Sequence, residues 1–220
     1  MLIAICCLGT TLYADTAAER LQASANVFQD IMSAPDKGIP QSLLADAYCV
    51  VIVPGVKKVA FIVGGKYGSG FAVCRRDNHS GWGAPSAVRV EGGSFGFQIG
   101  GSETDVVMLV MNATGMNHLL QDKFTLGGDA AVAAGPVGRS VSARTDAEMH
   151  AKILTYSRSH GVFAGVSLAG ATLTNDTDAN KELYGRPLRN SEVLMQNVKP
   201  PAPAKPLLSL LTKYSRRETS

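Results

Sequence analysis

The side chains best suited to chemistry are basic residues in a glycine-rich stretch, residues 54–101, where only one acidic residue, Asp77, precedes Glu91. Five of these basic residues are the candidate binding residues: Lys57, Lys58, Lys66, Arg75 and Arg76. Lysine and arginine neutralise phosphate, and glycine turns let backbone N–H groups approach an anion. The stretch therefore predicts an anion-binding surface, with a solvated sheet face of paired charges as the alternative. Because side chains alternate along a strand, Arg75 and Arg76 would face opposite ways, so only some of the five can act together.

A serine hydrolase is a second reading of the same stretch. Residues 92–96, Gly-Gly-Ser-Phe-Gly, match GxSxG, and Asp105 and His118 follow Ser94 in the hydrolase order. That motif needs a helix directly after the serine, whereas a strand-like Phe-Gly-Phe-Gln-Ile run follows here. We therefore predict no catalytic residues and keep the hydrolase as the weakest alternative.

Metal and cofactor signals are weak. Gly68-Ser69-Gly70 is not followed by the third glycine of a dinucleotide fingerprint, since Val73 stands there. The four histidines lack HxH or HxxxH spacing, so we expect no metal ion and no cofactor. Cys49 and Cys74 lie 25 residues apart without a CxxC motif. In an oxidising compartment they can form a disulfide, and otherwise they are two buried thiols.

Composition favours one soluble globular domain, since 220 residues that are 45% hydrophobic and 18% charged can bury a real core. Residues 199–220 hold five basic residues and one acid, a net charge of +4, whereas the whole chain is +3. Residues 1–198 therefore sum to −1. Net charge gives no support for a nucleic-acid partner.

Both ends of the chain carry distinctive segments. Residues 1–14 are apolar from Leu2 to Leu12 and end in Tyr-Ala, which predicts a signal peptide and export to the periplasm or envelope, although no basic residue precedes the apolar run. After Val198, the run Lys-Pro-Pro-Ala-Pro-Ala-Lys-Pro predicts an extended linker. The basic tail within 199–220 is expected either to lie on an anionic surface as a short helix or to be a disordered end.

The segment from Thr16 to Ala34 has the pattern of an amphipathic helix, with Thr16 and Glu19 spaced as a capping box. Its apolar stripe is expected to cover a sheet. Alternatively, the helix lies on a membrane surface with Arg20 as the base on its polar face. The residues that would then contact the membrane are Arg20, Leu21, Phe28, Ile31 and Met32.

The remaining pattern is dominated by short strands. A buried strand over residues 48–53 is expected to end at Pro54-Gly55, and strands over 59–63 and 71–76 are expected to join through Gly64-Gly65. Further strands are predicted within 87–91, 94–99, 106–111, 123–143, 148–157 and 162–174, and helices within 41–47, 112–121, 175–183 and 192–197. The segment 148–157 is equally compatible with a helix. This predicts an α+β domain: a curled antiparallel β-sheet or barrel of about eight strands, with N-terminal and C-terminal helices packed against it. Strand glycines are expected to form bulges that bend the sheet.

Several runs resemble one known family. They are residues 64–75 (GGKYGSGFAVCR), 81–86 (GWGAPS), 92–100 (GGSFGFQIG), 104–112 (TDVVMLVMN), 123–139 (KFTLGGDAAVAAGPVGR), 156–173 (YSRSHGVFAGVSLAGATL), and Asn180 with Tyr184-Gly185. These motifs are similar to those of the SYLF domain, the lipid-binding module of yeast actin-patch proteins and animal phosphoinositide-binding proteins. The resemblance spans about residues 16–186, and we assign residues 15–198 to the domain.

The resemblance implies non-catalytic binding of anionic phospholipid, with phosphoinositides as ligands and actin as a partner among eukaryotic members. In those relatives lipid contact is attributed to an N-terminal amphipathic helix, which here corresponds to the stripe beginning at Leu21. The leader-like start favours the exported bacterial type, which would bind phosphatidic acid, cardiolipin or similar headgroups at an envelope membrane. The alternative is an envelope scaffold that binds a protein partner.

Overall fold

The structure is a computed structural model that describes residues 15–34, 38–61, 63–76, 81–95, 100–136, 151–159, 162–165 and 168–216. The predicted signal peptide, residues 1–14, lies outside these ranges. Within them nine strands form one sheet in the order β5-β9-β3-β2-β1-β4-β7-β6, with β8 paired to β7. Their bounds are β1 Cys49–Phe61, β2 Val63–Cys74, β3 Ser86–Phe95, β4 Gly100–Val110, β5 Lys123–Thr125, β6 Val132–Ala134, β7 Ile153–Ser159, β8 Val162–Gly165 and β9 Thr172–Asn175.

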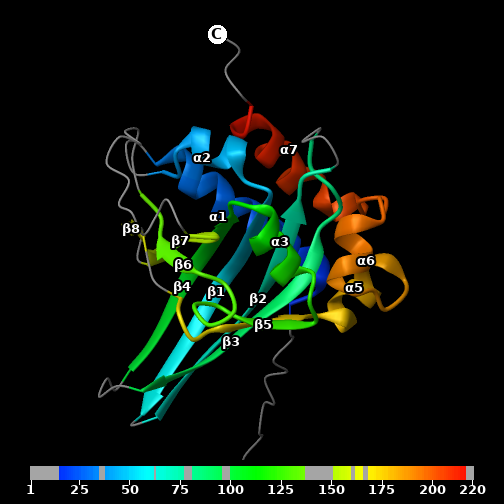
Figure 1. Cartoon of the computed structure of the whole chain (residues 1–220). Coiled ribbons are helices and arrows are strands. Elements are labelled where there is room, and N and C mark those ends of the chain that lie inside the picture. The colour runs from blue at the N-terminus through cyan, green and yellow to red at the C-terminus, as the bar shows by residue number, and fades with distance from the viewer. Residues whose placement is uncertain are drawn as a thin grey trace, which may run out of the picture.

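The helices gather at one end of four long strands, β1–β4 (Figure 1). They are α1 Ala17–Ser33, α2 Gln41–Asp46, α3 Ala113–Leu119, α5 Thr177–Tyr184, α6 Asn190–Met195, η3 Ala202–Ala204 and α7 Lys205–Tyr214. All neighbouring strands pair antiparallel except β6 and β7, which are parallel. The predicted α+β class, with a curled sheet and helices from both terminal regions, is confirmed.

Helix α1 lies across one face of the sheet and supplies much of the core. It begins at the predicted capping box, in which the Thr16 hydroxyl accepts from the Glu19 backbone N–H and the Glu19 carboxylate accepts from the Thr16 N–H. Leu21, Phe28 and Ile31 are each 0% exposed. They pack in one hydrophobic cluster with sheet residues and with α7. Burying such side chains contributes about 2 kcal/mol each, so the stripe of α1 is a core face in this fold.

The other face of the sheet has its own core. Its members include Val51 and Val56 of β1, Met108 of β4, and Phe124 and Leu173 from β5 and β9. Successive residues of β1 therefore point alternately into two different clusters, one under the helices and one on the opposite face.

The β1–β2 hairpin differs from its prediction. Pro54 and Gly55 do not end the strand but form a bulge, where the register of β1 against β4 shifts between Val53 and Val56. Gly55 adopts φ +55°, and its N–H donates to Asp105 Oδ1 at 3.0 Å. Glycine takes this left-handed conformation at little cost, so the extra residue is absorbed and the ladder continues. Likewise Gly64-Gly65 is not the turn, because pairing of β1 with β2 runs to Phe61 and Val63.

The C-terminal segment also differs from its prediction. Residues 199–216, expected as a linker and tail, form η3 and α7 packed against α1, with Leu207 and Leu211 each 0% exposed. Leucines four residues apart make one apolar helix face, and Pro206 is tolerated because it sits in the first turn of α7. The Trp82 indole N–H donates to Ser215 Oγ at 3.0 Å and anchors the far end of α7. The packed domain therefore continues beyond residue 198.

Among the described residues, no helix is both long and apolar enough to span a bilayer.

Candidate functional site

The predicted lysines lie where β1–β4 extend past the Gly55 bulge, away from the helices (Figure 1). Strand register places Lys58 of β1 directly opposite Lys66 of β2. The row continues to Gly92 of β3 on one side and Ser102 of β4 on the other. We call these four residues the lysine row. It carries two positive charges and no carboxylate.

The neighbouring row points to the other face of the sheet. It consists of Glu91, Tyr67, Lys57 and Glu103, again one residue from each of β3, β2, β1 and β4. Lys57 is exposed and has a carboxylate-bearing neighbour on β4 in direct register. We call these four residues the mixed row. Its side chains sum to −1, so Lys57 does not share the environment of Lys58.

Like charges directly opposite each other on paired strands destabilise a sheet. Lys58 and Lys66 are such a pair, and both side chains are only partly exposed. Within the described residues neither forms an ion pair with an acidic side chain. The lysine row is thus a place where an incoming anion would relieve repulsion.

Arg75 serves the interior rather than a surface. Its guanidinium donates to the backbone carbonyls of Leu44, Ala45 and Ala47 at 3.1–3.2 Å, which closes the C-terminal end of α2. It also lies 4.4 Å from the centroid of the Trp82 ring, a cation–π contact. These contacts occupy the guanidinium, so Arg75 is removed from the proposed binding set. Arg76 follows β2 and is exposed, with its backbone N–H donating to the Gly81 carbonyl.

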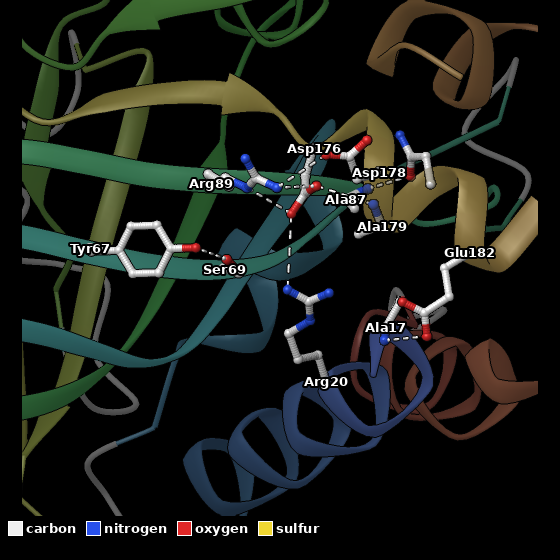
Figure 2. Close-up of polar contacts among 11 residues, drawn as sticks. Ala17, Arg20, Tyr67, Ser69, Ala87, Arg89, Asp176, Asp178, Ala179 and Glu182 are labelled. Atoms are coloured by element: carbon white, nitrogen blue, oxygen red, sulfur yellow. Dashed lines mark hydrogen bonds and ion pairs between the residues drawn. The ribbon is translucent and has the colours of Figure 1, made fainter. Parts of the chain in front are cut away.

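A second inward cluster joins three elements around Asp176, whose side chain is 2% exposed (Figure 2). Arg89 of β3 donates to it through Nε at 3.0 Å and Nη2 at 2.8 Å, and Arg20 of α1 lies 3.9 Å away on the other side. The same carboxylate accepts from the Ala179 N–H and so caps α5. Burial lowers the pKa of Arg89, but the hydrogen bond and charge of Asp176 outweigh it and raise the pKa above its ordinary value. Asp176 stands at the N-cap position of α5, where aspartate is typical, whereas nothing local in the sequence indicates its two arginine partners.

The remaining α1 residues predicted for membrane contact are in the core. Leu21, Phe28 and Ile31 are fully buried, and Met32 packs against the same cluster. The structure therefore favours the sheet-covering interpretation of this stripe, and a membrane role for these side chains would require α1 to leave the sheet.

Asn180, one of the residues that carried the family resemblance, is a buried connector. Its Oδ1 accepts from the Ala87 N–H at 2.8 Å, and its Nδ2 donates to the Leu188 carbonyl at 2.8 Å. Ser86 and Asn190 complete a hydrogen-bonded network that is almost wholly buried. A fully satisfied buried network of this kind specifies one packing of α5 and α6 on β3.

Comparison with known protein families identifies the family of the chain. Residues 91–214 match the model of the Ysc84 family, described as Las17-binding protein actin regulator. The chain belongs to the Ysc84 family. The match runs from the middle of β3 to the end of α7, so α7 is inside the family domain, and the resemblance to the SYLF domain is confirmed.

Curated relatives support the same assignment. The SH3 domain-containing protein PJ696.02 of Schizosaccharomyces pombe is 39% identical over 79% of this chain and 40% of its own length. The human SH3 domain-containing YSC84-like protein 1 is 33% identical over 83% and 53%, and Protein YSC84 of Saccharomyces cerevisiae is 35% identical over 80% and 38%. The chain thus spans about half or less of the length of these relatives. Two of these names mention an SH3 domain, and the family description names an actin regulator; none of them names an enzyme.

In this Ysc84-family domain Cys49 and Cys74 are direct partners across β1 and β2, and a disulfide joins them with S–S 2.01 Å. Both residues are buried, at 0% and 2% exposure.

The positions of Ser94, Asp105 and His118 in the Ysc84-family fold do not support the serine hydrolase alternative. Ser94 lies inside β3, whose pairing with β2 continues to Phe95, rather than at a strand-to-helix turn. Asp105 Oδ1 accepts from the Gly55 N–H, and the His118 ring lies against Phe124. Among the described residues, no three histidine, cysteine or acidic side chains come together as a metal site.

Proposed function

We propose that this domain binds anionic phospholipid headgroups without catalysis, and that Lys58 and Lys66 make the contact. The observation that carries the proposal is the lysine row, a like-charged cross-strand pair flanked by Gly92 and Ser102. A phosphate placed between two ammonium groups replaces their repulsion with two charge-assisted contacts. Lipid chemistry also fits the sequence between the lysines, because residues 59–63 read Val-Ala-Phe-Ile-Val.

The contrast with the mixed row makes the proposal specific. Lys57 is adjacent in sequence to Lys58, but it faces the other way and lies beside Glu103. A headgroup phosphate approaching that face would meet two carboxylates along with the single lysine. The resemblance to the SYLF domain implies the same ligand class, whereas the matching family model is described as an actin regulator.

The test is cosedimentation of the full chain with vesicles of phosphatidylcholine alone, or mixed with phosphatidic acid or with cardiolipin. Wild type should cosediment with both anionic mixtures at low salt and should bind less as salt screens the charges. It should not bind vesicles of pure phosphatidylcholine. Each lysine near anionic lipid contributes about 1 kcal/mol, so Lys58→Gln with Lys66→Gln should weaken binding roughly 30-fold.

Lys57→Gln is the matched control, because it removes the same charge from the adjacent position on the opposite face. It should leave binding within about threefold of wild type, since less than 1 kcal/mol is at stake. Equal losses in the two variants, or unchanged binding in the double variant, would refute the lysine row as the lipid site. Urea unfolding of each variant verifies that the fold is intact.

A further inference from the structure

The outer side of α7 forms the wall of a groove of about 630 Å³ that is separate from the lysine row. The proline-rich segment leading into the helix, with Pro200 and Pro201, also lines the groove. Leu208 contributes an apolar side chain to the lining, and Lys205, Lys213 and Arg216 contribute positive charge. Among the described residues, no acidic side chain lines it.

The bases lie along one side of the helix. Lys205 and Lys213 are eight residues apart, which at 1.5 Å per residue is about 12 Å along the axis and close to two turns. Both side chains and Arg216 are exposed. The groove thus presents a line of positive charge together with apolar side chains, and its complement is a segment with spaced carboxylates and small apolar side chains.

Helix α7 and the proline-rich segment before it are both held in place before anything binds. Leu207 and Leu211 anchor α7 in the core, the Trp82 indole N–H donates to Ser215, and Phe28 packs edge-on against Tyr214. The proline rings restrict the backbone conformation of the segment that leads into α7. A preformed groove loses little entropy on binding, which favours a peptide over a ligand that must induce the site.

We infer that this groove docks an extended acidic peptide segment of a protein partner. A bilayer surface is flat and contacts convex features, whereas here the charges line a groove together with apolar side chains. An extended peptide advances about 3.1 Å per residue, so carboxylates four residues apart match the spacing of Lys205 and Lys213. The inference is independent of the lipid proposal, because it uses different residues on a different element.

The experiment measures fluorescence anisotropy of a fluorescein-labelled peptide that repeats Glu-Leu-Ser-Pro three times, titrated with the full chain. The same peptide with glutamine in place of glutamate is the ligand control. Wild type should bind the acidic peptide and not the glutamine peptide. Lys205→Gln with Lys213→Gln should weaken binding about tenfold or more, because two ion pairs at a partly desolvated site are lost.

Lys181→Gln on α5 is the matched protein control, since Lys181 is an exposed base that is not part of the groove lining. It should bind the acidic peptide as wild type does. The groove variant should also retain binding to phosphatidic acid vesicles, which separates this site from the lysine row. Undiminished peptide binding in the groove variant, or loss of vesicle binding instead, would overturn the inference. Self-association of wild type that the groove variant abolishes would assign the groove to a second copy and overturn it as well.

Discussion

Arginines and lysines of one glycine-rich stretch have opposite uses in this domain. Arg75 and Arg89 turn inward, where one closes the carbonyl end of α2 and the other holds the buried carboxylate of Asp176. Lys58 and Lys66 lie on the extended ends of β1 and β2 without an acidic partner among the described residues. A guanidinium offers five donors in a fixed fork, whereas an ammonium is a compact charge on a flexible stem. Positive charge alone therefore does not mark a binding residue here.

The largest effect that we expect from this contrast between inward arginines and outward lysines is at Asp176. Asp176→Ala removes the partner of Arg89 and the cap of α5, so we expect a loss of about 3 kcal/mol in the free energy of unfolding. Arg89 is about one-third exposed, and water therefore keeps this below the cost of a fully buried broken pair. Urea denaturation followed by Trp82 fluorescence measures the loss.

Asp178→Ala is the matched control, because Asp178 is 90% exposed and 3.9 Å from the same guanidinium. It should change the free energy of unfolding by less than about 0.5 kcal/mol. A similar loss in both variants would mean that the cluster acts through general surface charge and not through the buried carboxylate.

Arg75 gives the next largest effect. Arg75→Ala should cost about 2 kcal/mol, because three carbonyls lose a charged donor and Trp82 loses its cation–π contact. Arg75→Lys keeps the charge but loses the fork, so it should still cost about 1 kcal/mol. Unfolding by urea should therefore separate the two variants.

The binding readout distinguishes the structural role of Arg75 from a headgroup role. Under conditions where the protein stays folded, Arg75→Ala should sediment with phosphatidic acid vesicles as wild type does. Arg76→Ala, the exposed neighbour, should leave stability within about 0.5 kcal/mol. Weaker vesicle binding by folded Arg75→Ala would restore this arginine to the lipid site.

Local patterns were enough to predict most elements. The predicted capping box at Thr16 is a short-range signal and is present, and Asn112 and Asp176 likewise cap α3 and α5 through their own side chains. The bulge at Gly55 was the main failure in the sheet, because Pro-Gly marks a turn locally and only the pairing with β4 shows that the strand continues. A helix in the tail was one of two expectations, but the prolines before α7 suggested a linker, and nothing local showed that this helix packs against α1.

The candidate site was less predictable than the fold. Alternation separates Lys57 from Lys58 in any strand, but placing Lys66 opposite Lys58 requires the turn to fall between Phe61 and Val63. Nor could the sequence show that Arg75 reaches α2, since its acceptors are about 30 residues away. Long-range contacts thus decided which of the five predicted bases remain candidates. The export signal at residues 1–14 stays a prediction.

The smallest predicted effect is on the free energy of unfolding, which a lysine-to-threonine substitution should raise in the lysine row and leave unchanged or lower in the mixed row. Lys66→Thr relieves the repulsion with Lys58 and adds a good strand former, so it should raise the free energy of unfolding by about 0.5 kcal/mol. Lys57→Thr gains the same strand preference but loses the attraction of Glu103 in register, so it should gain nothing or lose about 0.3 kcal/mol. Urea unfolding at about 10 mM and about 1 M salt should show the difference at low salt and erase it at high salt, where the screening length falls to roughly 3 Å. If Lys66→Thr stabilises the domain and also weakens vesicle binding, then the lysine row lowers stability in the free protein and is best explained as a site for an anion. If both variants shift stability in the same direction, the difference between the rows is not electrostatic, and the proposed lipid site loses its physical basis.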